Sequence, residues 1–365
     1  MSRIAVVLLN LGGPDSLAAV QPFLQNLFSD PAIIRAPAPV RWFLARLIAR
    51  RRAPIARAIY EKMGGRSPIL PETEAQAAVL ASALASSAPE HTWHVTIAMR
   101  YWHPLAAEAA HEVATFAPDR VVLLPLYPQY STTTTASSFA DWSAAAARAG
   151  IAVPTSRVCC YPRDGGFIAA VTDAAAEGLA RARAVAPGAP IRLLFSAHGL
   201  PKRVIAAGDP YQAQVEMSVA AVRDALARGG HLVDVEVVTC YQSRVGPLEW
   251  IGPATDAEIG RAGRAAAAIV VVPIAFVSEH SETLVELDIE YRHVAERAGA
   301  AAYIRVPAVG VAPAFIAGLA RLAVAASCCD NVVSGSDNQG MSRTCPAGFG
   351  GCGGPDIVSI AQQTG

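Results

Sequence analysis

Charged residues are scarce in this chain, and the two signs cancel. Only 16% of its 365 residues are charged, and 30 basic side chains stand against 30 acidic ones, which gives a formal net charge of zero. Because nucleic-acid binding relies on positive charge facing phosphates, no nucleic acid is expected as a partner. The low charge fraction, beside 53% apolar residues, also argues against disorder. The length predicts two domains.

Several motifs are absent as well. No GxGxxG or Walker pattern follows a predicted strand, so no nucleotide cofactor is expected. No GxSxG and no C-x-x-C occurs, which argues against serine hydrolases and thioredoxin-like redox enzymes. No 18 uncharged apolar residues run together, so no transmembrane segment is predicted. Residues 1–9 are followed by no small-residue cleavage site, which indicates a buried strand of a cytoplasmic chain rather than a signal peptide.

Short β-branched or apolar runs alternate with longer Ala-rich amphipathic stretches, a pattern typical of βαβ units. Eight strands are predicted, at residues 4–9, 95–99, 120–126, 155–160, 191–197, 235–239, 268–276 and 302–306. Four fall in each half. The expected fold class is α/β, with two similar Rossmann-like domains, each doubly wound on a four-stranded parallel sheet, and an active-site cleft between them. The predicted parts are an N-terminal domain (1–160), a C-terminal domain (161–310), a helix (311–326) and a Gly-rich, cysteine-bearing tail (327–365).

One histidine follows a predicted strand directly. His198 ends the strand at 191–197 and precedes Gly199, which would leave its imidazole exposed over the cleft. Histidine at such a place is a natural base or metal ligand near neutral pH. The alternative is a structural histidine that a backbone carbonyl satisfies.

Three regularly spaced glutamates indicate a metal site more strongly than the histidine does. Glu282, Glu286 and Glu290 are spaced i, i+4, i+8, so their carboxylates share one face of the predicted helix after residue 276. Like charges at this spacing repel each other, and a divalent cation would offset the repulsion. Carboxylate with imidazole suits Fe²⁺, Zn²⁺, Co²⁺ or Ni²⁺ better than Ca²⁺. The alternative is a solvated acidic face balanced by Arg292 and Arg297.

Aromatic residues gather at the same strand ends. They are Tyr101, Trp102, Tyr127, Tyr130, Tyr211, Tyr241, Trp250 and Phe276. Stacking and apolar walls hold large planar ligands, and a few polar groups orient them. Arg100 and Arg244 could bind the carboxylates of such a ligand, or each could close a structural salt bridge.

A basic segment precedes the second predicted strand. Residues 35–57 hold seven arginines and no acid, with Trp42, Phe43, Leu44, Leu47 and Ile48 among them. An apolar stripe with a basic flank suits an interfacial helix on anionic lipid, which would associate a cytoplasmic chain with the inner face of the membrane. The alternative is a solvated helix packed on its own domain.

The seven cysteines are unevenly placed. Cys159 and Cys160 are adjacent, Cys240 is alone, and four more lie in the last 38 residues, at Cys328, Cys329, Cys345 and Cys352. In a chain of cytosolic character, such usage indicates metal or redox chemistry before disulfides. Cys240 is expected to be a small buried hydrophobe.

Seven long motifs occur together in this chain. They are LLNLGGPDS (8–16), EKMGGRSPI (61–69), MRYWHP (99–104), LLPLYPQYSTTTTASS (123–138), FSAHGLPKRVIAAGDPY (195–211), TCYQSRVGPLEWIGP (239–253) and PIAFVSEHSETLVELDIEY (273–291). Through them the sequence resembles the ferrochelatases, the terminal enzymes of haem synthesis, from about residue 4 to residue 322. The resemblance implies insertion of Fe²⁺ into a porphyrin, normally protoporphyrin IX, with no nucleotide cofactor. A chelatase for coproporphyrin or sirohydrochlorin, and a non-catalytic porphyrin or metal carrier, are the alternatives.

The resemblance also assigns residues. It implies that His198 and Glu282 are the pair that binds iron and abstracts protons from the pyrrole nitrogens, with either role open to either residue. Glu286 and Glu290 fall on an acidic track thought to move metal or protons. The positions expected near the macrocycle are Asn10, Leu11, Arg100, Tyr130, Tyr211, Trp250 and Phe276. Whether the chain is a monomer or a homodimer stays open.

Some ferrochelatases carry a [2Fe–2S] cluster bound by one internal and three C-terminal cysteines. The internal ligand of the animal form corresponds to Thr132 here, so that arrangement does not apply. Certain bacterial members use a cysteine just after the fourth strand and a terminal C-x₆-C pair, which correspond here to Cys159 or Cys160 and to Cys345 with Cys352. The fourth ligand would be Cys328 or Cys329. The alternative is inert thiols on a Gly-rich tail.

Overall fold

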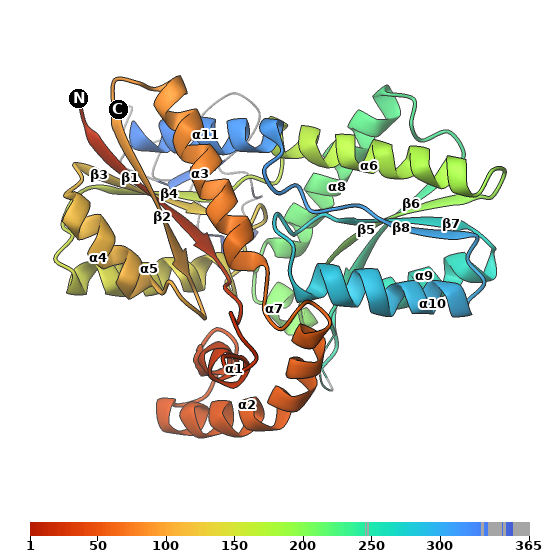
Figure 1. Cartoon of the computed structure of the whole chain (residues 1–365), viewed down its shortest axis with the longest axis horizontal. Coiled ribbons are helices and arrows are strands. Elements are labelled where there is room, and N and C mark those ends of the chain that lie inside the picture. Colours follow the sequence, from red (N-terminus) through yellow and green to blue (C-terminus); the bar gives the residue numbers. More distant parts are fainter. Residues whose placement is uncertain (245, 247, 330–331, 335–344, 346–347, 353–365) are drawn as a thin grey trace. The chain divides into compact units, whose positions relative to one another are not determined.

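The chain folds into two compact units (Figure 1). The computed structural model describes residues 1–244, 246, 248–329, 332–334, 345 and 348–352. The first unit holds Met1–Cys160 and the described residues of Leu319–Thr344. The second holds Tyr161–Gly318 and the described residues of Cys345–Cys352.

The first unit is built on a parallel sheet. Its strands are β1 (Arg3–Asn10), β2 (Thr92–Met99), β3 (Arg120–Pro125), β4 (Thr155–Cys160) and β9 (Val332–Ser334). They lie in the order β2-β1-β3-β4-β9, and every pair is parallel. Helices α4 (Ala106–Phe116) and α5 (Thr135–Arg148) cover one face through Val113, Phe139 and Trp142. Strands β1 and β3 are buried at every position after the first, on both faces of the sheet, which is why they read as continuous apolar runs. Helix α3 (Ile69–Ser87) packs beside β2.

Two further helices of this unit lie beyond the carboxyl-terminal ends of its central strands (Figure 1). They are α1 (Val20–Ser29) and α2 (Ala38–Glu61). Helix α2 buries a narrow stripe, Ala45, Ala49 and Ala53, with Tyr60 near its end, because residues four apart share one helix face. Pro54 lies inside α2, where it removes a helical hydrogen bond, and the helix bends in Figure 1.

The second unit repeats the plan. Its strands are β5 (Ile191–His198), β6 (Val235–Gln242), β7 (Ala268–Pro273) and β8 (Ala302–Arg305), in the order β6-β5-β7-β8 with all pairs parallel. Helices α6 (Gly165–Val185) and α8 (Tyr211–Arg228) pack together on the sheet, as do α9 (Thr255–Arg264) and α10 (Tyr291–Arg297). Two short helical elements, α7 (Lys202–Ala206) and η1 (Glu282–Glu290), follow β5 and β7. Helix α11 (Pro313–Ser327) begins in this unit and ends in the first.

The structure confirms the predicted fold class, and all eight predicted strands are present. The two sheets share the order 2-1-3-4, counted within each unit. One correction concerns the first sheet, which has a fifth strand, β9, drawn from the segment predicted to be a tail. A second concerns the strand predicted at 268–276, which ends at Pro273 because proline cannot donate to a ladder. A third concerns the segment after it: residues 282–290 form a π-helix, wider than the usual α-helix.

Among the described residues, no helix has both the length and the apolar character needed to cross a membrane.

Candidate active site

The topology of the second unit brings two of the predicted residues together. The chain leaves β5 for β6 and then crosses back to β7, so the strand order reverses between β5 and β7. Doubly wound sheets bind ligands at the carboxyl ends of strands beside such a point. His198 is the last residue of β5, and Glu282 opens η1, which follows β7. Two residues 84 positions apart in the sequence therefore meet at this edge.

His198 and Glu282 form a close pair. His198 Nδ1 lies 2.8 Å from Glu282 Oε2, and the two side chains are 36% and 26% exposed. Burial acts to raise the pKa of Glu282, but the charge and hydrogen bond of His198 outweigh it and lower the pKa to about 2. Burial acts to lower the pKa of His198, and the Glu282 carboxylate overcomes it and raises the pKa above its ordinary value. Each group thus stabilises the charged form of the other.

Ser243 connects this pair to the second glutamate. Its backbone N–H donates to Glu286 Oε1 at 2.9 Å, and its hydroxyl lies 3.2 Å from Glu282 Oε2 and also bonds Glu286 Oε2. A hydroxyl has one proton, so it can donate to only one carboxylate at a time. Burial, and after it the nearby Glu282 charge, raise the pKa of Glu286 above its ordinary value. Ser243 has a φ of +62°, a left-handed conformation that is rare outside glycine and often marks a functional site.

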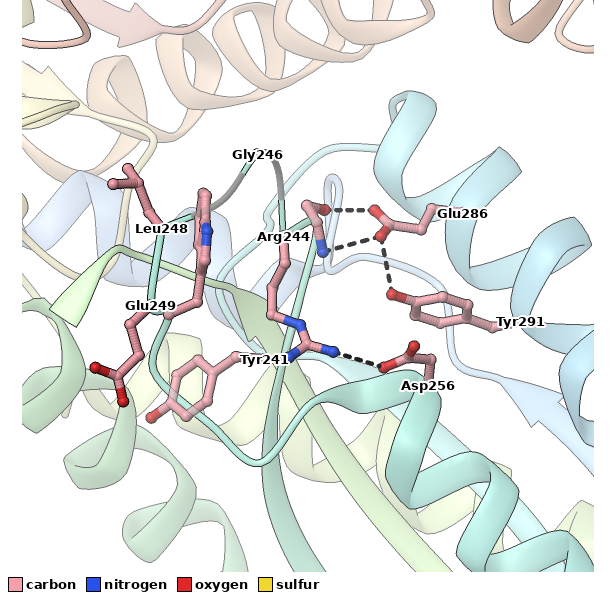
Figure 2. Close-up of a pocket in the computed structure, with 10 residues that line it drawn as sticks. Tyr241, Arg244, Gly246, Leu248, Glu249, Asp256, Glu286 and Tyr291 are labelled. Carbon is pink, nitrogen blue, oxygen red and sulfur yellow. Dashed lines mark hydrogen bonds and ion pairs between the residues drawn. The ribbon is translucent and has the colours of Figure 1, made fainter.

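Two more side chains hold Glu286 in place. Tyr291 donates its hydroxyl to Glu286 Oε1 at 2.9 Å, as Figure 2 shows. The buried Gln242 donates from Nε2 to Glu286 Oε2 at 3.1 Å and accepts from Ser196 Oγ at 2.7 Å. Glu290, the last residue of η1, is exposed. The structure thus brings Glu282 and Glu286 together through Ser243.

A pocket of about 480 Å³ opens beside this network (Figure 2). It is lined by Tyr241, Ser243, Arg244, Gly246, Leu248, Glu249, Trp250, Asp256, Glu286 and Tyr291. Arg244 faces Asp256 at 3.5 Å, with both side chains about half exposed. The Arg244 guanidinium therefore has a carboxylate partner within the protein, as one of the two predicted alternatives states.

The remaining candidates of the second unit are aromatic. Trp250 contacts the His198 ring edge to face, with centroids 6.4 Å apart. Gly199 permits this approach, since a Cβ there would lie 2.9 Å from the Gln242 carbonyl oxygen and 3.2 Å from the Trp250 ring. Phe276 contacts the ring of His280 at 4.6 Å. Tyr211 is buried at the start of α8, and its burial raises the hydroxyl pKa.

Four candidates lie in the first unit. Asn10 ends β1, where its amide nitrogen donates to Thr73 at 2.9 Å and its oxygen accepts from the Leu11 N–H at 2.8 Å. Leu11 is half-buried, and Tyr130 is buried against Cys159 and Cys160.

Arg100, the fourth of them, follows β2. Its guanidinium pairs with the buried Asp30 at 2.9 Å and donates to Ser137 at 2.7 Å. Tyr101 also donates to Asp30 at 2.7 Å, and Asp141 lies 3.6 Å from Arg100. Most of the guanidinium's bonding capacity is therefore used inside the protein.

The candidate cluster cysteines belong to both units. Cys159 and Cys160 end β4, with their sulfurs 3.5 Å apart. The carbonyl of Cys329 accepts from Ser156, three residues earlier on the same strand, which corresponds to about 10 Å of strand length. Cys345 is buried in the second unit, where Gln214 donates to its sulfur at 2.9 Å. Across the described part of the chain, no three His, Cys, Asp or Glu side chains are placed to hold a metal ion.

The residues that sequence reasoning missed are Ser243, Gln242 and Tyr291. All three lie inside the long motifs at 239–253 and 273–291, but their residue types carry no signal of their own. Serine and glutamine after a strand are ordinary, and neither the positive φ nor the long-range contacts can be read from composition.

Comparisons with known proteins identify the family of the chain. A family model described as Ferrochelatase matches residues 3–327. A protein named Ferrochelatase from Caulobacter vibrioides (strain NA1000 / CB15N) is 56% identical over 322 residues, which cover 87% of this chain and 89% of that protein. Proteins of the same name from Phenylobacterium zucineum and Hyphomonas neptunium are 52% and 51% identical over 96% of this chain, and the matches cover 97% and 94% of those proteins.

Identity of this degree over nearly the whole length assigns the chain to the metal-inserting lyases, an enzyme class. The chain belongs to the ferrochelatase family.

Proposed function

We propose that this chain inserts Fe²⁺ into protoporphyrin IX to give protohaem, the last step of haem biosynthesis. The observation that carries the proposal is the His198–Glu282 pair, 2.8 Å apart at the strand-order reversal of the second unit. Insertion replaces two pyrrole N–H protons with one metal ion, so the site must accept protons and supply ligands to Fe²⁺. An imidazole beside a carboxylate can do both.

His198 and Glu282 divide these roles. One of them acts as the base toward the pyrrole nitrogens, and the other binds the incoming iron. A single ligand from the pair leaves the other coordination positions of Fe²⁺ to water and then to the porphyrin nitrogens, so the iron is not trapped in a closed site. Glu286 and Glu290 extend the acidic face and also bind metal on its way to the pair. Negative charge that exceeds the nearby positive charge favours a divalent cation here.

The macrocycle is held by apolar and aromatic contacts in this proposal. The residues proposed to contact it are Asn10, Leu11, Arg100, Tyr130, Tyr211, Trp250 and Phe276. Trp250 is supported by its contact with the His198 ring, and Phe276 by its contact with the His280 ring. A rigid aromatic wall suits a large planar ligand whose ring must bend to expose a pyrrole lone pair.

The activity is tested by anaerobic fluorescence. Purified protein is mixed with Fe²⁺ and an excess of protoporphyrin IX, and the fluorescence should fall through many turnovers. A single stoichiometric loss would support a carrier, and unchanged fluorescence would contradict both functions. Parallel reactions with coproporphyrin, and with sirohydrochlorin plus Co²⁺, test the choice of tetrapyrrole.

We also propose that residues 35–57 contact an anionic lipid surface, which would bring a cytoplasmic protein to the inner face of the membrane. In α2, Val40, Trp42, Phe43 and Ile55 are 50%, 56%, 61% and 69% exposed. Their neighbours include the exposed arginines Arg46, Arg50, Arg51 and Arg52, and residues 35–57 contain no acidic residue. Apolar insertion combined with positive charge is the physical basis of interfacial binding.

Vesicle sedimentation tests this contact. Phosphatidylglycerol vesicles should bind the protein, phosphatidylcholine vesicles should not, and added salt should weaken binding. Trp42→Ser with Phe43→Ser should release it, whereas Val185→Ser, which removes an equally exposed apolar residue of the second unit, should not. Equal binding to both lipids, or release by the Val185 variant, would contradict the proposal. Sedimentation velocity without vesicles distinguishes a monomer from a homodimer.

A [2Fe–2S] cluster bound by Cys345, Cys352, one of Cys159 and Cys160, and one of Cys328 and Cys329 is the third proposal. Its support is the donor chemistry and the C-x₆-C spacing. Among the described residues, no three His, Cys, Asp or Glu side chains are placed to hold a metal ion. No step of metal insertion therefore depends on the cluster.

Spectroscopy of anaerobically purified protein tests the cluster. The visible absorbance of iron and sulfide, and the paramagnetic signal after one-electron reduction, should be lost in Cys345→Ser and kept in Cys240→Ala, the control. Cys240 lies in the core of the second unit, where burial raises its pKa to about 12 and keeps it protonated. No such absorbance in the wild type would end the proposal.

A further inference from the structure

One buried cation holds both ends of the segment that carries the two glutamates. Arg305 is the last residue of β8, and its side chain is only 10% exposed. Its Nη1 lies 2.6 Å from Glu279 Oε1, and both Nε and Nη2 lie 2.9 Å from Asp288 Oδ2. Glu279 stands three residues before Glu282, and Asp288 two residues after Glu286.

Neighbouring contacts reinforce the same attachment to β8. Tyr303 donates its hydroxyl to the Leu287 carbonyl at 2.6 Å. Arg292 donates to the Tyr303 carbonyl and to Asp288, both at 3.0 Å. Glu279 additionally accepts from the Ala308 N–H at 3.0 Å. The segment 279–288 is therefore bound on its far side by side chains and backbone that do not touch His198.

The π-helix η1 needs contacts of this kind to keep its conformation. A π-helix is rare and usually limited to one turn, so a nine-residue example depends on contacts from outside the helix. A shift of one residue along η1 would move Glu282 away from His198 and Glu286 away from Ser243. We propose that Arg305 is a positioning residue for metal insertion, which fixes η1 through Glu279 and Asp288 so that Glu282 stays at His198. The inference rests on the proposed function.

The side chain suits this role for a physical reason. A guanidinium presents five donors in a planar fork and can bind two carboxylates in fixed directions, whereas an ammonium is a single compact charge. A buried ion pair is weak evidence for stability, and in this proposal the contribution of Arg305 is alignment. Lysine at position 305 is therefore expected to keep the charge and lose part of the alignment.

Kinetics with a matched control test the proposal. Arg305→Met should lower kcat about 10- to 100-fold with the porphyrin KM changed by less than about 3-fold, since a displacement of about 1 Å can cost that much. Arg305→Lys should recover part of the loss. Arg192→Met is the control, because Arg192 is 14% exposed and pairs with Glu236 at 2.7 Å near the amino-terminal end of β5, the opposite end from His198. It should lower Tm and leave kcat within about 2-fold of wild type.

Hydrogen exchange gives a readout that does not need activity. Peptides covering 279–290 should exchange faster in Arg305→Met than in wild type or Arg192→Met. If kcat and exchange in Arg305→Met match those in Arg192→Met, Arg305 is merely structural and the proposal is overturned. If the wild type shows no turnover, the proposed function fails, and the exchange of 279–290 alone decides whether Arg305 holds η1.

Discussion

The two units share one strand order and differ in charge at equivalent positions. Asn10 ends the first strand of its unit, and His198 ends the first strand of the other. The next strand is followed by Arg100 in the first unit and by Ser243 in the second. Equivalent positions on similar sheets therefore carry different chemistry.

The difference lies in whether charge is balanced. In the first unit the Arg100 cation meets the buried Asp30 carboxylate, which also accepts from Tyr101. In the second, Glu282 and Glu286 share Ser243, and His198 pairs with Glu282 alone. A balanced cluster stabilises the fold, whereas an edge with excess carboxylate attracts a metal ion. Fold alone does not distinguish the two, because function resides in the side chains that follow the strands.

The largest expected effect is on kcat, and it should distinguish the second unit from the first. His198→Ala should lower kcat about 10²- to 10⁴-fold, since it removes a base or a metal ligand. Porphyrin binding, measured by fluorescence quenching without metal, should stay within about 3-fold of wild type. Asn10→Ala, at the equivalent position, should change KM more than kcat. Comparable kcat losses in both variants would contradict the functional distinction between the strand ends of the two units.

The largest effect on stability, in contrast, is expected in the first unit, at Asp30. Asp30 is 3% exposed and accepts from Arg100, Tyr101 and Ser137. Asp30→Asn leaves Arg100 without its nearest charge partner and should cost about 3 kcal/mol of unfolding free energy. Asp141→Asn, which removes a partner at 3.6 Å, should cost less than about 1 kcal/mol. Thermal unfolding checks both, and equal shifts in Tm would show that burial of the pair is unimportant.

A smaller effect tests the link between the glutamates. Ser243→Ala and Ser243→Gly both remove the hydroxyl bonded to Glu282 and Glu286, but glycine accepts the φ of +62° without strain. If the hydroxyl matters, both variants should lose about 10-fold in kcat, as for a lost hydrogen bond to a charged group. Full activity in Ser243→Gly would mean that only the backbone conformation matters.

Patterns in the sequence were sufficient to predict the fold class, because buried parallel strands appear in a sequence as short continuous apolar runs. His198 was found for the same reason, since it ends a recognisable strand. Strand β9 could not be found, because three residues in a Gly- and Ser-rich stretch pair only at a sheet edge that already exists. The i, i+4 spacing of the glutamates identified a helix but not its π form. The Arg100–Asp30 pair joins residues 70 positions apart, which no local pattern predicts.

The smallest expected effect is a dependence of stability on pH in the metal-free protein. The pKa of Glu282 is lowered to about 2 by folding, so its contribution is fully present above about pH 4.5 and is lost as the pH falls toward 2. The pKa of His198 is raised, so the contribution is fully present below about 6.5 and is lost as the pH rises through the raised value. Both statements describe one ion pair, which therefore stabilises most between about pH 4.5 and 6.5.

The free energy of unfolding of the wild type should exceed that of Glu282→Gln by about 1 kcal/mol in that window, after solvent screening of a partly exposed pair. Urea unfolding at pH 5.5 and 9 checks this. A difference that is as large at pH 9 as at pH 5.5 would show that His198 carries no proton in the pair. The same measurement on Asp30→Asn should show no such decline, because the partner there is a guanidinium rather than an imidazole.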